Sequence, residues 1–354
     1  MPQTNAFDTL AFTQNLARET RQSLGFRART RPEAVRWQQD LREALSALLG
    51  GFPQRCALTP RVFEKKDFGR YVRETVIFRS RPGLDVFAYW LLPAETAEDK
   101  EKGERKLPCV ICLPGHGRGV DSIVGLDAKG RMRPWGAWGE YASDFALQCV
   151  AAGYAVLAVE QMGFGHRRDE TAVAEGPDAS SCQPAAGAAL LLGGTMAGWR
   201  VWDAMRAVDY TLTRPEADAG RIAVMGISGG GMTALFTAAL DERIRAAVVS
   251  GYCNSFRDSI LSIPHCIDNY VPGILRVAEM ADVAGLIAPR SLFLESGTLD
   301  PIFPIKASRA AFRDIRKVYE VFDALKAVGM EAFEGEHRFH GRKAFEFLGK
   351  TFSP

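Results

Sequence analysis

Ser228 stands in a G-x-S-x-G turn that runs from Gly226 to Gly230. Residues 221–226 are largely apolar and favour a strand, whereas residues 232–236 favour a helix. A strand that continues through such a turn into a helix presents the serine hydroxyl as a nucleophile at the end of a sheet. Glycines at both ends of the turn avoid collisions with the neighbouring strand or helix, and the serine is held in a strained backbone conformation. A tight turn beside an exposed serine is the alternative, but the flanking strand and helix favour a catalytic serine.

A catalytic serine needs a base, because its hydroxyl is a poor nucleophile until a neighbouring imidazole takes the proton. The chain has five histidines: His116, His166, His265, His337 and His340. His337 comes directly after the last predicted strand, residues 331–333, where a sheet of this kind presents its base. His340 is close enough to compete. We favour His337 because it comes soonest after the turn at Gly335.

A carboxylate is also needed, because it fixes the tautomer of the histidine and stabilises the imidazolium. Asp300 follows the predicted strand 290–296 directly and precedes Pro301. An Asp-Pro pair is by itself a common turn signal. The order Ser, then Asp, then His, each after its own strand, favours a catalytic role instead. Glu295 and Asp323 are weaker candidates, because one lies within a predicted strand and the other within a predicted helix.

Acyl transfer further requires two main-chain N–H groups directed at the developing oxyanion. The residue after the nucleophile, Gly229, supplies one of them. The glycine-rich loop 113–119 follows another predicted strand and supplies the second. We assign that donor to the N–H of His116, with Gly117 as the alternative. His116 would then act through its main chain and not as a base.

We expect no metal and no cofactor. His116 has no second ligand at a suitable spacing in the sequence. Cys109 and Cys112 form a C-x-x-C, but they lie in an apolar run that favours a buried strand, where residues three apart point to opposite faces. The adjacent pair His265 and Cys266 is read as lining or structural, because neighbouring side chains rarely face each other.

The elements that must position these residues alternate along the chain. Two helix-like segments lie within residues 6–50, and residues 71–78 and 84–92 predict an antiparallel hairpin. From residue 107 onward, apolar strands alternate with helices. The predicted strands are 108–113, 154–160, 221–226, 244–250, 290–296 and 331–333, and the predicted helices are 140–152, 198–212, the segment after the Ser228 turn, and 305–328. Continuous hydrophobicity marks strands covered on both faces, so the pattern predicts an α/β fold with a mainly parallel, eight-stranded sheet flanked by helices.

Residues 1–60 are expected to form a helical extension packed on the core, and residues 61–354 the catalytic domain. The Gly-, Ala- and Ser-rich residues 171–197 predict a loop insertion near the mouth of the site. The N-terminal helices could mediate association into a homo-oligomer.

Composition narrows the classes of partner and compartment. A formal charge of +2 on 354 residues gives no electrostatic reason to expect nucleic acid or an anionic membrane. The N-terminus lacks a basic patch followed by an apolar core, and no window reaches the length of a membrane span. Seven scattered cysteines argue against a disulfide framework and for a reducing compartment. We therefore expect a cytoplasmic protein that acts on a small or polymeric neutral molecule.

With these residues in place, the chain resembles α/β-hydrolases of the dienelactone hydrolase and acetyl xylan esterase-like branch. The resemblance covers roughly residues 70–350 and rests on several motifs together. Besides the Ser228 turn and the Asp300 and His337 segments, these motifs are Trp-Asp-Ala-Met-Arg-Ala-Val-Asp-Tyr at 202–210, Arg-Pro-Glu-Ala-Asp at 214–218, Asn-Tyr-Val-Pro-Gly-Ile at 269–274 and Ile-Ala-Pro-Arg at 287–290. The resemblance implies a serine hydrolase that needs no cofactor, and several members are regarded as esterases of acetylated carbohydrates.

Two departures from this branch matter. Dienelactone hydrolases proper use a cysteine nucleophile, whereas this chain has Ser228, and Pro114 stands where a histidine is common before the oxyanion glycine. Simple ester hydrolysis is therefore favoured over lactone chemistry.

The sequence thus predicts a carboxylic-ester hydrolase that acts on short acyl esters, acetyl esters above all, with carbohydrate esters as one substrate class. Ser228, His337 and Asp300 would form its triad, and turnover would pass through an acyl-enzyme. A serine peptidase of the prolyl oligopeptidase type is an alternative, although no repeated short strands suggest its propeller. A catalytically silent hydrolase fold used for binding is the other alternative.

Overall fold

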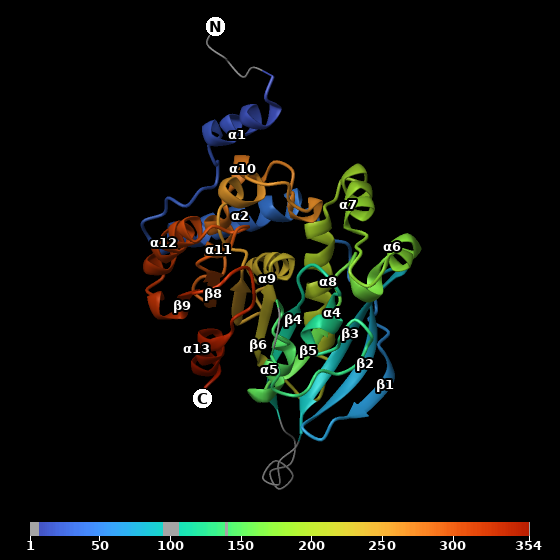
Figure 1. The fold of residues 1–354 in the computed structure, drawn as a ribbon. Coiled ribbons are helices and arrows are strands. Elements are labelled where there is room, and N and C mark those ends of the chain that lie inside the picture. Colours follow the sequence, from blue (N-terminus) through green and yellow to red (C-terminus); the bar gives the residue numbers. More distant parts are fainter. Residues whose placement is uncertain (1–6, 95–105, 139–140, 354) are drawn as a thin grey trace.

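A single sheet runs through the centre of the protein in the computed structural model, which describes residues 7–94, 106–138 and 141–353 (Figure 1). Within these residues the sheet has nine strands, in the order β1-β2-β3-β5-β4-β6-β7-β8-β9. Their bounds are β1 Arg61–Asp67, β2 Tyr71–Arg81, β3 Leu84–Pro93, β4 Leu107–Leu113, β5 Ala155–Val159, β6 Ala217–Ile227, β7 Ala246–Ser250, β8 Ser291–Gly297 and β9 Val328–Phe333.

Strand pairing divides the sheet into two parts. β1, β2, β3 and β5 pair antiparallel in that order, and β5, β4, β6, β7, β8 and β9 pair parallel. β5 and β7 are buried along their whole length, as expected of strands that carry helices on both faces. The predicted α/β fold with a mainly parallel sheet flanked by helices is confirmed.

The predicted count of eight strands is wrong by one edge strand, β1, among the residues described. All seven residues of β1 are exposed, and the strand pairs only with β2. Its sequence, Arg-Val-Phe-Glu-Lys-Lys-Asp, has no alternation of apolar and polar residues, because neither face of the strand is buried. Its charges suit an edge that must not pair with another chain.

Helices cover both faces of the sheet (Figure 1). The core on one face includes side chains of α8 Met196–Thr211, α9 Gly229–Leu240, α11 Met280–Gly285 and α12 Ile305–Val321. The core on the other face includes side chains of α4 Val120–Ile123, α5 Phe145–Ala151 and α13 Arg342–Phe352. The remaining short helices are η1 Gly165–Arg167, α6 Glu170–Glu175, α7 Cys182–Leu191, η2 Phe256–Ile260, η3 Ile267–Asn269, α10 Ile274–Val277 and η4 Leu325–Ala327.

Two helices are shorter than the sequence pattern predicts. α5 begins at Phe145, because Asp144 before it has a left-handed backbone with φ of 46°. α12 ends at Val321, just before Asp323, which has φ of 57°. A residue with a left-handed backbone conformation cannot continue a right-handed helix. The spacing of apolar residues in the sequence does not reveal which residues adopt this conformation. The predicted loop insertion at residues 171–197 contains most of α6 and all of α7.

The N-terminal helices are α1 Thr9–Glu19 and α2 Arg31–Leu48. Thr30 and Glu33 form a reciprocal capping box that fixes the start of α2. Trp37 lies on the buried face of α2, and its indole N–H donates to the carbonyl oxygen of Leu24 at 2.7 Å. The Gln38 amide donates at 2.8 Å to the main chain of Ala288, beside β8. α2 therefore packs on the core, while the division into 1–60 and 61–354 stays a prediction.

The seven cysteines, all within the described residues, are free thiols. Among the described helices, none combines the length and apolar character that crossing a membrane would require.

Candidate active site

Ser228 lies at the junction of β6 and α9 with φ of 55° and ψ of −122°. Its N–H donates to the carbonyl oxygen of Ser250 at the end of β7, at 3.0 Å. This conformation is rare for a residue with a side chain, and it is the strained turn that the sequence predicts. The main chain is therefore held where the serine leaves the sheet.

Gly226 and Gly230 are required by close packing at this turn. A Cβ added at Gly226 would lie 2.2 Å from the carbonyl oxygen of Gly230, and one at Gly230 would lie 2.0 Å from that of Leu113. Real side chains do not approach main-chain oxygens this closely, so alanine at either position would displace the turn. The predicted role of the two glycines is confirmed.

Asp300 and His337 are brought together by the loops after β8 and β9. Oδ2 of Asp300 lies 2.6 Å from Nδ1 of His337, and the Asp300 side chain is buried. Oδ1 of Asp300 accepts the main-chain N–H groups of Ile302 and Phe303 at 2.8 and 3.0 Å. Asp300 thus forms the turn expected of an Asp-Pro pair and still offers its other oxygen to the imidazole.

The ring of His337 lies between two aromatic rings and against Gly251. Its centroid lies 5.6 Å from the ring of Tyr141 and 5.5 Å from that of Phe303. A Cβ added at Gly251, the residue after β7, would come within 3.0 Å of His337 Cε1. Nε2 of His337 is buried and bonds to no other described residue. The ring nitrogen that a general base uses is therefore unpaired among the described residues, and the ring lies against Gly251, next to the Ser250 that bonds to Ser228.

His340 has a different environment. Its Nδ1 lies 3.3 Å from Oε2 of Glu331, and its ring stacks on Phe333 with centroids 4.6 Å apart. Its main-chain N–H donates to Glu295 at 2.9 Å. Burial raises the pKa of Glu295, whose carboxyl group also accepts the N–H of Gly341. Glu295 and His340 thus fix the chain that follows His337 and do not contact the Asp300–His337 pair.

Tyr141 is a site residue that the sequence did not reveal. Its hydroxyl group lies near the side chain of Ser228. The hydroxyl lies over Gly115, where an added Cβ would be 2.0 Å away from it. Burial raises the pKa of Tyr141, so the hydroxyl keeps its proton and can donate it in a hydrogen bond. Tyr141 falls within the predicted helix 140–152, but α5 begins only at Phe145 and leaves Tyr141 in an irregular segment.

The loop that contains His116 and Gly117 lies against the start of α9, which begins at Gly229. Gly229 is the first residue of α9, so its N–H has no acceptor within the helix. A Cβ added at Gly229 would lie 3.3 Å from the ring of His116. Gly117, the alternative donor, has φ of 115°, a conformation that favours glycine. The loop after β4 therefore lies against the start of α9, and both His116 and Gly117 stay candidates for the second donor.

Glu160 follows β5 and fixes two neighbouring loops. Its carboxylate oxygens accept the main-chain N–H groups of Val120 and His166, each at 3.1 Å. Gly119 and Gly165 leave room for it, since a Cβ at either position would come within 2.2 Å of a carboxylate oxygen. Burial raises the pKa of Glu160 from 4.5 to about 7.

This raised pKa makes the stability of the protein depend on pH. The folded state binds a proton at Glu160 more tightly than the unfolded chain does, so the stabilisation is complete below pH 4.5 and is lost as pH rises through 7. Between pH 8 and pH 5 the free energy of unfolding should gain on the order of 2 kcal/mol from this group. Urea unfolding of the wild type and of Glu160→Gln at both pH values measures it, and an equal pH dependence in the two proteins would contradict the assignment.

The fold also brings together side chains that could bind a metal ion. One potential ligand atom from each of His116, Cys182, Cys266 and Asp268 lies within 4.8 Å of the others. No spacing in the sequence predicts this group, because the four residues come from segments far apart in the chain. Long-range packing, and not the spacing of a motif, creates the group.

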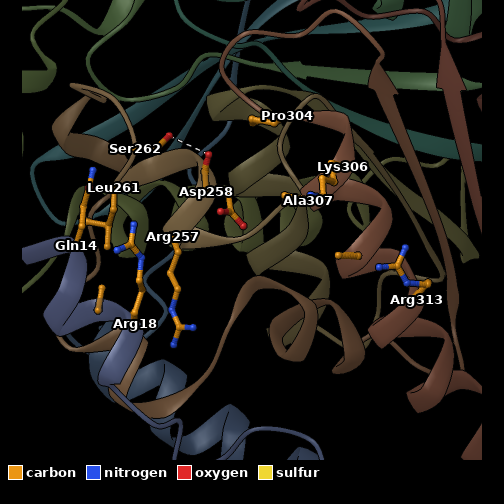
Figure 2. A pocket seen from close by; sticks show the side chains of 12 residues that line it. Gln14, Arg18, Arg257, Asp258, Leu261, Ser262, Pro304, Lys306, Ala307 and Arg313 are labelled. Atoms are coloured by element: carbon orange, nitrogen blue, oxygen red, sulfur yellow. Dashed lines mark hydrogen bonds between the residues drawn. The ribbon is translucent and has the colours of Figure 1, made fainter. Parts of the chain in front are cut away.

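A pocket of about 630 Å³ lies between α1, η2 and the start of α12 (Figure 2). Arg18, Arg257, Lys306 and Arg313 are among the residues that line it. Ser228, Asp300 and His337 are not, so this pocket is separate from the candidate active site.

Solved structures share this fold. A protein of Bacteroides fragilis NCTC 9343, provisionally named an acetyl xylan esterase, superposes with a TM-score of 0.78 at 19% identity, over 96% of this chain and 88% of its own. A glucuronoyl esterase from Solibacter usitatus superposes with a TM-score of 0.65 at 17% identity, over 89% of this chain and 92% of its own. At these identities the likeness shows a common α/β-hydrolase fold.

Sequence comparison also finds a relative that is named as a hydrolase. A protein of Bacillus subtilis (strain 168), YtaP, provisionally named a hydrolase, is 27% identical over 288 residues, 78% of this chain and 86% of YtaP. The predicted resemblance to α/β-hydrolases is confirmed, whereas the narrower dienelactone hydrolase branch stays a prediction. The model of the abhydrolase family matches residues 5–343. Because this match extends over nearly the whole chain, the protein belongs to the abhydrolase family.

Proposed function

We propose that this protein is a serine-dependent carboxylic-ester hydrolase. The observation that carries the proposal is the Asp300–His337 pair, 2.6 Å apart, in a fold that holds Ser228 in a strained turn. An acid, a base and a serine in this arrangement are the parts that activate a hydroxyl for acyl transfer. The α/β-hydrolase fold and the family membership support the same reaction class.

In the proposed mechanism, Oγ of Ser228 attacks the ester carbonyl carbon while Nε2 of His337 takes the hydroxyl proton. Asp300 accepts a hydrogen bond from Nδ1–H of His337 and stabilises the imidazolium. The N–H groups of Gly229 and of His116 or Gly117 bind the oxyanion. His337 then gives its proton to the leaving alcohol. A water molecule, deprotonated by the same ring, attacks the acyl-enzyme and releases the carboxylic acid and free Ser228.

We propose that Tyr141 adds a further hydrogen bond to the oxyanion, because its hydroxyl lies near Ser228 and keeps its proton. Loss of one oxyanion donor typically costs 10²- to 10³-fold in kcat, so Tyr141→Phe should lower kcat on p-nitrophenyl acetate by about 10²-fold. Tyr154→Phe is the matched control, since it removes the hydroxyl of a buried tyrosine that packs near Phe352. A kcat within about twofold of wild type for Tyr141→Phe would exclude this role.

The proposed substrates are short-chain acyl esters, acetyl esters above all, with carbohydrate esters as one class. Support comes from neighbours in the fold that are named as esterases of acetylated xylan and of glucuronoyl esters. A series of p-nitrophenyl esters from acetyl to octanoyl, assayed beside acetylated xylan and acetylated sugars, tests the proposal. We expect kcat/KM to be highest for acetyl and to fall with chain length, and a preference for long acyl chains would contradict it.

A further inference from the structure

Four side chains with metal-binding chemistry converge beside the candidate active site. His116 lies in the loop after β4, and Cys182 begins α7. Cys266 lies just before η3, and Asp268 lies within it. One ligand atom from each of the four residues lies within 4.8 Å of the others. Cys182 and Asp268 are buried, and His116 and Cys266 are half-buried. Three separate segments therefore meet at one small volume that contains two thiols, an imidazole and a carboxylate.

The spacing of these atoms fits a tetrahedral metal site. With metal–nitrogen and metal–oxygen bonds of about 2.0 Å and metal–sulfur bonds of about 2.3 Å, ligand atoms in a tetrahedron are about 3.3 Å apart for nitrogen and oxygen and about 3.8 Å for two sulfurs. Nε2 of His116 lies 3.3 Å from Oδ2 of Asp268. Small side-chain shifts would bring the two sulfur atoms, already within 4.8 Å of the other ligand atoms, to this geometry.

Arg200 supports the cluster from outside. Its Nη1 donates to Oδ2 of Asp268, and its Nη2 lies 2.9 Å from Sγ of Cys182. Nη2 and Nε of Arg200 also donate to the carbonyl oxygen of Met162, and the amide of Asn269 donates to Oδ1 of Asp268 at 2.6 Å. Hydrogen bonds of this kind orient metal ligands and fix their basicity.

The charges also balance around a divalent ion. Two thiolates and one carboxylate carry three negative charges, and a divalent cation together with the buried Arg200 carries three positive charges.

We propose that His116, Cys182, Cys266 and Asp268 bind one Zn²⁺ ion. Two sulfurs, one imidazole nitrogen and one carboxylate oxygen suit zinc, and four protein ligands leave no open position, so the ion would be structural. On binding, the two thiols lose their protons to solvent, and the imidazole binds in its neutral form through Nε2.

The ion would connect the loop after β4 to α7 and to the η3 loop. The ring of His116 lies against Gly229, so this connection is made next to the main-chain donors proposed for the oxyanion. Zinc would thus fix the position of the His116 loop relative to the start of α9. It would take no part in proton transfer, which the Asp300–His337 pair supplies in the proposed mechanism.

The test is zinc stoichiometry of the full chain. Protein reduced and stripped with a chelator is dialysed against a small excess of Zn²⁺ and analysed by mass spectrometry for metal. We expect one zinc per chain in the wild type and none in Cys182→Ser and Cys266→Ser. Cys56→Ser is the matched control, since Cys56 is a half-buried free thiol near Ser80 and should leave the stoichiometry at one. Co²⁺ in place of Zn²⁺ should give a thiolate-to-metal charge-transfer absorption that both cluster variants lose.

Three results would overturn the proposal. One is the absence of zinc in the wild type, and another is equal zinc in Cys266→Ser, which indicates binding elsewhere. The third is a native protein that contains a disulfide between Cys182 and Cys266 and that takes up no zinc after the disulfide is reduced. Ser228→Ala should still bind one zinc, so a failure of the metal proposal can be told apart from a failure of the esterase proposal.

Discussion

Replacing Ser228 by alanine should reduce kcat/KM on p-nitrophenyl acetate by about 10⁴-fold or more, because the acyl-enzyme can no longer form. Removal of Oγ leaves the main chain of the turn unchanged, and its bond to the carbonyl oxygen of Ser250 is retained. The loss should therefore appear in turnover and not in folding. Initial rates, together with the circular dichroism spectrum and Tm, measure the two effects separately.

Ser262→Ala is the control for this experiment. Ser262 is exposed beyond η2, and its hydroxyl donates to main-chain oxygens of Asp258 and Ser259. Its loss should leave kcat/KM within about twofold of wild type. If Ser228→Ala keeps more than about a tenth of wild-type activity, the nucleophile is another residue or the reaction does not pass through an acyl-serine.

His337→Ala and His340→Ala should differ by orders of magnitude in activity. His337 bonds to the buried Asp300 and has an open Nε2, so its loss should lower kcat by about 10⁴-fold or more. His340 bonds to Glu331 and stacks on Phe333, so its loss should lower Tm and change kcat by less than about tenfold.

The comparison is internally controlled, because both variants remove an imidazole from the same loop after β9. Rates are measured at saturating p-nitrophenyl acetate, and Tm is measured for both proteins. A larger loss of kcat in His340→Ala than in His337→Ala would show that His340, and not His337, is the base.

The positions of the parallel strands along the chain could be predicted from the sequence, because burial on both faces leaves a continuous apolar run. β5 and β7 are buried throughout, and the strands predicted at 154–160 and 244–250 lie close to their observed bounds. β1 was missed because an exposed edge strand carries no such run. Helix ends at Asp144 and Asp323 were missed because a left-handed residue leaves no apolar signal.

The candidate catalytic residues were predictable for a different reason. Ser228 directly follows β6, and Asp300 and His337 lie in the loops after β8 and β9. In a parallel sheet the carboxyl ends of the strands meet at one edge. Tyr141 and Cys182 lie in long segments between strands, and tertiary packing alone decides where their side chains point. Sequence reasoning therefore finds groups tied to the sheet and misses groups that the loops bring to it.

Labelling of the native protein with a fluorophosphonate, followed by peptide mapping, tests the central claim most directly. Such a reagent reacts with a serine hydroxyl only when a neighbouring base activates it. We predict a single adduct on Ser228 in the wild type, with none in Ser228→Ala and strongly slowed labelling in His337→Ala. A native protein that does not react, or that reacts at a residue other than Ser228, would contradict the account.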